Sequence, residues 1–292
     1  MQKKLLVISE INLNNENRGI EILNRTFASL SRQYSITAIS VGKQPLFMHE
    51  NWLKLNDTIF NKVHHIKYIG YLANYFFWAY CYLKTKIFVA SNKPKFDIMY
   101  LIGPMSAFIG KNINYDNIPV INRYLGVAWD YEGYQSIPQR IRFFLKKQGY
   151  KSSQGTIIMT NDGTRGAEFL KKMGIFNKIY FMRNGITKEI AVDLGYVKHL
   201  REIYGIKHDQ TVLLTVSRLA SWKRVDRAIC LLKELLKAND KYILMIVGDG
   251  EERDHLISLA NELNCLGNIR FIGAVENKLT PNYFYLADIF LS

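Results

Sequence analysis

The chain has 292 residues, of which 48% are hydrophobic and 22% charged, and its formal net charge is +14. This balance is typical of a globular protein and excludes a disordered or collagen-like chain. The length suits one large or two ordinary domains, since a domain usually runs to roughly 100–200 residues. Cys81, Cys230 and Cys265 lack the spacing of a zinc or redox site, so we interpret them as reduced thiols of a cytosolic protein.

Short apolar runs alternate with helix-spaced apolar positions along the first half of the chain. This pattern is typical of βαβ units around a parallel sheet. We predict strands over residues 4–9, 35–41, 97–102, 120–124, 156–160 and 178–182. After the first strand we expect a polar loop over 12–19 and then a helix with one apolar face, formed by Ile20, Leu23, Phe27 and Leu30.

The second half of the chain repeats the pattern. We predict strands over 211–217, 242–247, 268–272 and 288–292, with a helix after each of the first two. Residues 1–184 form one predicted domain and residues 185–292 the other, because a turn-forming Asn-Gly pair and a change in charge balance coincide there. Two such α/β lobes are expected to enclose a cleft at the carboxyl ends of their strands, where ligands of open α/β sheets bind.

The excess positive charge lies entirely in the first domain. Residues 1–184 hold 25 lysines and arginines against 11 aspartates and glutamates, whereas residues 185–292 hold 14 of each kind. This asymmetry indicates an anionic partner such as nucleic acid, a phosphorylated substrate or a membrane surface, with a merely soluble basic surface as the alternative. The absence of a recognisable binding motif, and of basic residues among the clustered aromatic ones, argues against nucleic acid.

Two segments have the composition of membrane-surface helices. Residues 68–83 form the longest uncharged run and hold eight aromatic residues, but a spanning helix needs roughly 20 apolar residues. Ile141, Phe144 and Leu145 follow helical spacing and are flanked by Arg140, Arg142, Lys146, Lys147 and Lys151. Both segments suit helices on an anionic bilayer, or else they simply cover the sheet. The apolar run after Lys3-Lys4 is too short for a signal peptide, so we expect a cytoplasmic protein, peripheral on the inner face of the plasma membrane.

Two cations stand on the predicted loop after the strand at 211–217. The sequence over 216–226 is Val-Ser-Arg-Leu-Ala-Ser-Trp-Lys-Arg-Val-Asp, which places Arg218 and Lys223 between that strand and the next helix. Arginine offers a planar fork and lysine a compact point charge, a pair that suits a diphosphate. The alternative is a solvated basic loop.

A Gly-Asp-Gly turn follows the next strand, at residues 248–250. Glycines there let backbone approach a ligand closely, and the helix start beyond them donates N–H groups to anions. Arg253 stands where a dinucleotide fingerprint needs its third glycine, which argues against a nicotinamide dehydrogenase. The acidic side chains of Glu251, Glu252 and Asp254 are also typical of a helix N-terminus.

Four segments, at 216–226, 246–250, 269–273 and 285–291, resemble in order and spacing the retaining glycosyltransferases of family 4. The segments at 161–164 and 184–186 also resemble members from bacterial surface-polysaccharide pathways. The resemblance implies an α/β protein of the GT-B fold, with two Rossmann-like, doubly wound lobes facing a cleft. It further implies transfer of a sugar, with retention, from a nucleotide-diphosphate donor to an acceptor hydroxyl in polysaccharide or glycolipid synthesis.

The same resemblance assigns roles to individual residues. Arg218 and Lys223 would stabilise the leaving diphosphate as the catalytic pair. The implied donor-binding residues are Gly19, Asn184, Gly248, Asp249, Gly250, Gly273, Ala274 and Val275, and Asp130 and Asp162 are predicted on the acceptor side. The expected partners are a nucleotide-sugar, a saccharide or lipid-linked acceptor and an anionic membrane. No metal or other cofactor is expected, since the six histidines lack ligand spacing and such enzymes use basic side chains and a helix dipole instead.

The chain also departs from the family pattern. Arg224 stands where the family usually has glycine, the glycine-rich loop after the first strand is reduced to Gly19, and Asn122-Arg123-Tyr124 lacks the histidine of many members. The family's paired glutamates and its C-terminal helix have no counterpart, so we expect a truncated second lobe with reduced stability and weak or no activity. The alternative function is therefore an inactive nucleotide-binding remnant or a membrane-associated scaffold.

Overall fold

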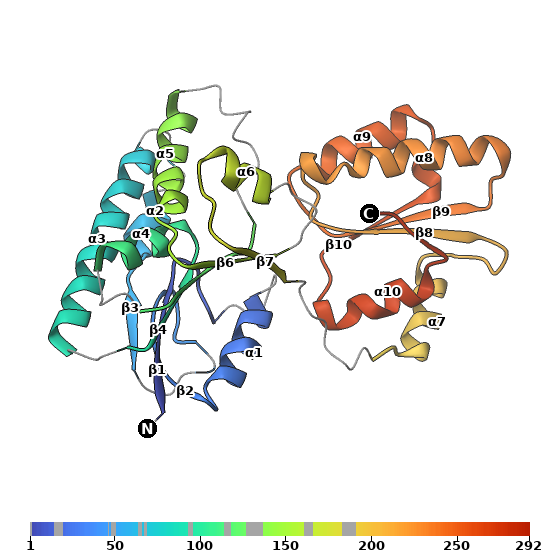
Figure 1. The fold of residues 1–292 in the computed structure, drawn as a ribbon. Coiled ribbons are helices and arrows are strands. Elements are labelled where there is room, and N and C mark those ends of the chain that lie inside the picture. Colours follow the sequence, from blue (N-terminus) through green and yellow to red (C-terminus); the bar gives the residue numbers. More distant parts are fainter. Residues whose placement is uncertain are drawn as a thin grey trace. The chain divides into compact units, whose positions relative to one another are not determined.

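The computed structural model describes residues 2–14, 20–45, 47, 51–63, 66, 69–92, 96–113, 118–126, 137–160, 166–182 and 191–292. The chain divides into two compact units, Met1–Ile186 and Thr187–Ser292, which we call the N-terminal and C-terminal units. Each unit has its own parallel sheet and its own hydrophobic core (Figure 1).

The strands described in the N-terminal unit form one parallel sheet in the order β3-β2-β1-β4-β5-β6-β7. They are β1 (Lys3–Ser9), β2 (Tyr34–Val41), β3 (Trp52–Leu55), β4 (Ile98–Ile102), β5 (Val120–Tyr124), β6 (Thr156–Thr160) and β7 (Ile179–Met182). The strand order reverses between β1 and β4. In open α/β sheets, ligands bind outside the carboxyl ends of the strands at such a switch point.

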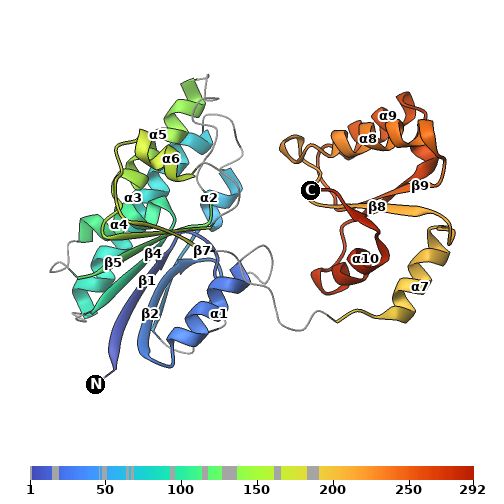
Figure 2. The ribbon, with the colours of Figure 1, turned by 45° about the vertical axis from the view of Figure 1, so that its right-hand side comes forward.

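Helices cover both faces of this sheet (Figure 2). Side chains alternate along β1, so that Leu5 and Val7 pack with α1, whereas Leu6 and Ile8 pack with α3 and α4 on the opposite face. A strand segment buried on both faces is continuously apolar, as residues 5–8 of β1 are. The helices are α1 (Ile20–Leu30), α2 (Thr58–Val63), α3 (Ile69–Asn92), α4 (Pro104–Ile113), α5 (Ile137–Lys151) and α6 (Gly166–Lys172).

The C-terminal unit has a smaller parallel sheet with strand order β10-β9-β8-β11. Along β9, Leu244 and Ile246 face α8 and α9, while Met245 and Val247 face α7 and α10. The strands are β8 (Thr211–Val216), β9 (Tyr242–Val247), β10 (Ile269–Gly273) and β11 (Ile289–Phe290). The helices are α7 (Leu194–Ile203), α8 (Val225–Ala238), α9 (Arg253–Glu262) and α10 (Thr280–Leu286).

The predicted strands are confirmed, with ends that move by up to two residues. The strand expected over 288–292 contains only two residues as β11. The prediction missed β3, a four-residue strand at the edge of the sheet that pairs with β2. An edge strand buries less of its surface than a central one, and Lys54 interrupts the apolar pattern of this one.

Residues 69–83 of the uncharged run belong to the longer helix α3, which is apolar on two faces. Trp78, Cys81 and Val89 point into the core of the unit. On the outer face, large apolar side chains are exposed at every third or fourth position; these are Ile69, Leu72, Phe76, Tyr80, Leu83 and Ile87, with exposed fractions of 36–73%. Among the described residues, none of the helices has both the length and the apolar character of a membrane span.

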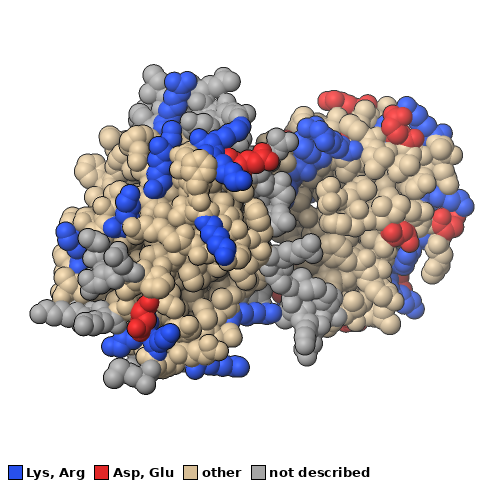
Figure 3. Space-filling model, viewed as in Figure 1, with Lys and Arg blue, Asp and Glu red and all other residues tan. Residues whose placement is uncertain are grey.

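In α5 the buried aromatic residues are Phe143 and Tyr150, while Phe144 is exposed. The side chain of Ile141 lies outside the described part of the chain. Figure 3 shows lysines and arginines spread over the visible face of the N-terminal unit, with few acidic residues among them.

Candidate functional site

Three loops meet at the carboxyl edge of the C-terminal sheet. The backbone N–H of Leu219 donates to the carbonyl of Asp249 at 3.0 Å, which joins the loop after β8 to the loop after β9. The N–H of Gly248 donates to the carbonyl of Gly273 at 2.8 Å, which joins the loop after β9 to the end of β10. The loops that carry Arg218, the Gly-Asp-Gly turn and residues 273–275 therefore lie side by side, as parallel pairing of adjacent strands requires.

The two glycines of the turn are required by the neighbouring loop. Gly248 has a φ of +133°, and a Cβ atom there would overlap with the carbonyl oxygen of Ser217. A Cβ at Gly250 would overlap with the carbonyl oxygen of Leu219. These glycines thus allow the two loops to pack backbone against backbone, whereas the sequence suggested close approach to a ligand. The turn is closed further by Asp249, whose carboxylate accepts the N–H of Gly250 at 2.8 Å.

Arg218 is exposed at this edge and forms an ion pair. Its Nη2 lies 2.9 Å from Oε2 of Glu251, and more than half of each side chain is exposed to solvent. A backbone N–H and then Arg218 hold the pKa of the Glu251 carboxyl below its usual value. Glu251 lies two residues before the first residue of α9. Its carboxylate therefore pairs with Arg218, in addition to the favourable position near a helix N-terminus that the sequence indicated. An exposed ion pair is worth only about 0–1 kcal/mol, so an anionic ligand can replace Glu251 at little cost.

Lys223 ends a short 3-10 turn (Ser221–Lys223) before α8 and is exposed. Its Nζ lies 4.3 Å from the centroid of the Trp222 ring, a cation–π contact. Arg224 follows in the left-handed conformation that glycine favours, with φ 53° and ψ 38°. The turn therefore has a left-handed backbone although arginine occupies it, and Arg224 Nη2 pairs with Asp226 Oδ2 at 2.8 Å.

The end of β10 leaves this edge open. Gly273 has a φ of +85°, and no heavy atom lies within 4 Å of the position that its Cβ would take. Ala274 is exposed, and Val275 packs partly against the core on the α7 and α10 face. The structure thus brings the predicted donor-binding residues of the C-terminal unit to one solvent-accessible edge.

Four predicted site residues lie outside the described residues: Gly19, Asp130, Asp162 and Asn184. Their roles stay predictions. Within the described ranges, no group of three or more His, Cys, Asp or Glu side chains is placed to hold a metal ion.

A second cluster of charged residues, which the sequence analysis did not assign to a site, lies at the carboxyl edge of the N-terminal sheet. Glu10, Arg123 and Lys146 line a cavity of about 280 Å³ there. The signal in the sequence is an arginine within the otherwise uncharged strand Val-Ile-Asn-Arg-Tyr, at 120–124. A charged residue in a strand that is expected to be buried on both faces needs a partner.

The comparisons with known proteins concern mainly the C-terminal unit. Residues 197–292 match the family model described as Glycosyl transferases group 1. Over 96 residues the chain is 30% identical to the alpha-monoglucosyldiacylglycerol synthase of Streptococcus pneumoniae (strain ATCC BAA-255 / R6). The aligned region covers 33% of this chain and 22% of that protein. A synthase of the same name from Acholeplasma laidlawii is 28% identical over 96 residues, 33% of this chain and 24% of that protein. The match therefore spans less than a quarter of either relative.

Solved structures resemble almost the whole chain. A crystal structure of Anabaena HepE in complex with UDP has a TM-score of 0.65 at 15% identity, over 98% of this chain and 73% of that one. WaaG, a glycosyltransferase involved in lipopolysaccharide biosynthesis, has a TM-score of 0.62 at 14% identity, over 98% and 74% of the two chains. The fold is thus the α/β GT-B fold of glycosyltransferases, as the sequence predicts.

Proposed function

We propose that this chain is a glycosyltransferase that moves a sugar from a nucleotide-diphosphate donor to an acceptor hydroxyl, with retention of the anomeric configuration. The observation that carries the proposal is the exposed pair Arg218 and Lys223 on the β8–α8 connection, beside the glycine turn. This sheet edge belongs to the segment that matches the glycosyltransferase family model, and ligands of open α/β sheets bind at such edges.

The two cations suit a leaving diphosphate. When the bond between the sugar and the diphosphate breaks, negative charge develops on the diphosphate oxygens, and preorganised cations lower the free energy of that state. Arg218 can offer a planar fork to two oxygens once Glu251 is displaced, and Lys223 adds a point charge.

The test of the donor site is the affinity for UDP, chosen because the HepE structure contains it. We expect Arg218→Ala together with Lys223→Ala to raise the Kd at least tenfold, since a hydrogen bond to a charged group contributes about 1.5–3 kcal/mol. The control is Lys198→Ala together with Arg201→Ala on α7, which packs on the other face of the sheet from α8. An unchanged Kd in the first double variant contradicts the assignment.

The reaction itself separates the alternatives. Transfer of sugar to a product of retained configuration, measured by NMR, supports the proposal, and an inverted product contradicts retention. UDP binding without transfer favours the inactive nucleotide-binding remnant.

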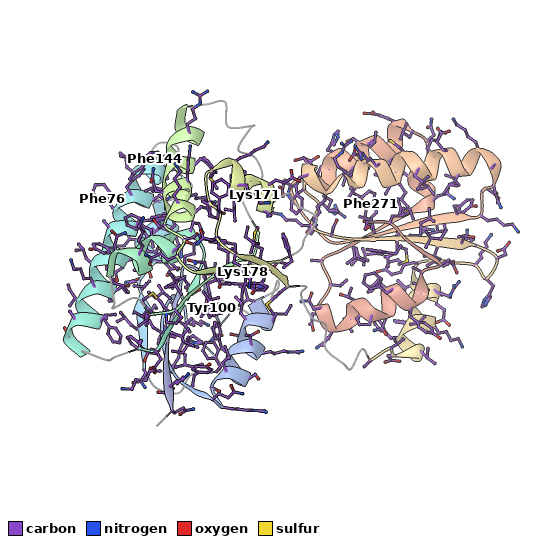
Figure 4. The ribbon with its side chains drawn as sticks, in the orientation of Figure 1. Phe76, Tyr100, Phe144, Lys171, Lys178 and Phe271 are labelled. Atoms are coloured by element: carbon purple, nitrogen blue, oxygen red, sulfur yellow. The ribbon has the colours of Figure 1, made fainter. Side chains whose placement is uncertain are left out.

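We also propose that the transfer takes place at a membrane surface, onto a saccharide or lipid-linked acceptor. The supporting observation is the outer face of α3, where Phe76 is 73% exposed and Leu72 is 64% exposed. Figure 4 shows Phe76 on the outer side of α3 and Phe144 on the neighbouring α5. A cavity of about 420 Å³ between α2 and α3, lined mainly by apolar side chains, continues this face. An apolar helix face on a basic unit suits the boundary of an anionic bilayer.

Flotation with lipid vesicles tests the membrane proposal. We expect Leu72→Ser together with Phe76→Ser to weaken binding to anionic vesicles at least tenfold, because two large side chains no longer enter the bilayer. Phe176→Ser is the matched control, since Phe176 is 79% exposed and precedes β7, away from α3 in the sequence. Equal binding of both variants contradicts this use of α3.

A further inference from the structure

The cavity at the carboxyl edge of the N-terminal sheet is built by the ends of adjacent strands. Glu10 follows β1, and its backbone N–H donates to the carbonyl of Ile102 at the end of β4 at 3.2 Å. The N–H of Gly103 donates to the carbonyl of Arg123 on β5 at 3.0 Å. The cavity of about 280 Å³ lies at the lower edge of the roughly 300–1,000 Å³ typical of small-molecule pockets.

Arg123 is buried in the wall of this cavity, and within the described ranges no carboxylate forms an ion pair with it. The residue is 3% exposed, and its Nη2 donates to the hydroxyl of Thr160 at 3.3 Å. Its Nε and Nη1 are buried, and neither has an acceptor in the part of the chain that the structure describes. Burial lowers the pKa of the guanidinium. A buried cation costs free energy unless an anion or hydrogen-bond acceptors compensate it, so these nitrogens mark the place of a missing partner.

The other charged groups around the cavity favour an anion there. Lys146 of α5 lines the same cavity and adds a second positive charge. Glu10 is a carboxylate on the cavity wall, but it accepts the backbone N–H groups of Met105 and Ser106 in the first turn of α4. Gly103 makes room for this arrangement, because a Cβ there would overlap with the Glu10 side chain. The start of α4 is thus satisfied by Glu10, and Arg123 is left to bind a ligand.

We propose that this pocket binds a phosphate group through Arg123, with Lys146 as the second cation, and that the phosphate belongs to the sugar acceptor. The second half of this statement rests on the proposed function. A guanidinium with buried N–H donors forms charge-assisted hydrogen bonds to phosphate oxygens, and a lysine adds a point charge. The acceptor class that follows is a phosphorylated lipid or a phosphorylated sugar.

The first experiment measures thermal unfolding of the full chain in inorganic phosphate against sodium chloride of equal ionic strength. It uses Arg218→Ala together with Lys223→Ala as the background, so that phosphate at the proposed donor site makes no contribution. At ten times the Kd we expect Tm to rise by about 4 °C. Arg123→Met should abolish the rise, and Arg32→Met, an exposed arginine of the same unit, should keep it. An equal rise in the Arg123→Met and Arg32→Met proteins overturns the proposal.

Glu10→Gln provides a second test should Arg123→Met fail to fold. Glutamine keeps an oxygen for the N–H of Met105 and removes the negative charge beside the bound phosphate. We expect phosphate to bind at least threefold more tightly at pH 8. Unchanged or weaker binding overturns the proposal.

Two sources of phosphate are distinguished with phosphatidic acid vesicles and soluble glycerol 3-phosphate. A lower affinity of Arg123→Met for the vesicles assigns the pocket to a lipid headgroup, and loss of the glycerol 3-phosphate response alone assigns it to a soluble acceptor. A response to neither probe in the parent protein overturns the proposal. The Kd for UDP separates this pocket from the proposed donor site. The Arg123→Met protein should bind UDP as tightly as the parent protein does. If the parent protein does not bind UDP, the proposed donor site is contradicted, but the phosphate pocket is not.

Discussion

Arg224 holds the turn before α8 in the left-handed region, where a side chain clashes with its own backbone. The cost of this conformation relative to glycine is about 1 kcal/mol, and the exposed ion pair with Asp226 offsets part of it. We expect Arg224→Gly to be more stable than Arg224→Ala by about 0.5–1 kcal/mol. Both variants lose the ion pair, but only alanine keeps the strain. Urea unfolding measures the difference, and a more stable alanine variant would show that the turn tolerates another backbone conformation.

Three glycines of the C-terminal unit form a graded series. Gly248→Ala meets both a positive φ and an overlap with the carbonyl of Ser217, so we expect a loss of about 3 kcal/mol or more. Gly273→Ala has a positive φ but open space, which predicts a loss of about 1 kcal/mol. Gly267→Ala has neither problem and should change the free energy of unfolding by less than about 0.5 kcal/mol. Equal losses in all three would contradict the packing of the two loops.

Glu10 makes stability depend on pH. Burial raises the pKa of its carboxyl to about 7, and the N–H groups of α4 and the charge of Lys146 offset burial only in part. Because the folded-state pKa is above the unfolded one, the stabilisation by the protonated carboxyl is complete below about pH 4.5 and is lost as pH rises through about 7. We expect Glu10→Gln to exceed the parent protein in stability at pH 8 by up to about 3 kcal/mol, with no difference at pH 4. Urea unfolding at both pH values measures this, and a constant difference would contradict the shifted pKa.

At the scale of elements, α3 separates a core face from an outer face. Val89 is fully buried and Ile87, two residues before it, is 65% exposed. We expect Val89→Ala to cost about 2 kcal/mol through lost burial and a cavity, while Ile87→Ala changes stability by less than about 0.5 kcal/mol. If α3 lies on a bilayer, Ile87→Ala should also weaken vesicle binding and Val89→Ala should not. Similar losses of stability in both variants would show that the outer face is covered.

The elements differ in how far the sequence determines them. Central strands such as β1 and β9 contain continuous apolar runs where both faces are buried, and the sequence predicts them within a residue or two. The edge strand β3 escapes prediction because it has only four residues, Lys54 interrupts its apolar pattern, and it pairs with a neighbour on one side alone. For α3 the periodicity predicts a helix, but apolar residues on two faces do not indicate which face is buried.

The proposed donor site and the pocket at Arg123 also differ in how far the sequence predicts them. Arg218 and Lys223 are predictable because both lie in one short loop after a strand. The pocket at Arg123 is assembled from Glu10, Arg123 and Lys146, which are far apart in the sequence. It requires the strand order and the register of β1, β4 and β5, which no local pattern specifies.

At the scale of the whole molecule, the charge is distributed unequally between the units. Residues 1–184 carry the entire excess of lysine and arginine, and the outer face of α3 lies in the same unit. Each basic residue near an anionic membrane contributes about 1 kcal/mol at low salt, and this attraction falls off within a Debye length of about 10 Å at 0.1 M salt. The charge of the N-terminal unit therefore supplies a long-range attraction to the membrane, while the outer face of α3 supplies the apolar contact with the bilayer.

The two contributions predict a specific salt response. Binding to vesicles that contain phosphatidylglycerol should weaken at least tenfold between 0.1 and about 0.5 M sodium chloride, because the Debye length falls and the attraction of the N-terminal unit is screened. Binding to phosphatidylcholine vesicles should be weak at both salt concentrations, since the outer face of α3 then binds without electrostatic attraction. Leu72→Ser together with Phe76→Ser should lower the affinity for anionic vesicles at each concentration and keep the slope against salt. Salt-independent binding, or equal binding to both lipids, would show that the positive charge of the N-terminal unit does not contribute to vesicle binding.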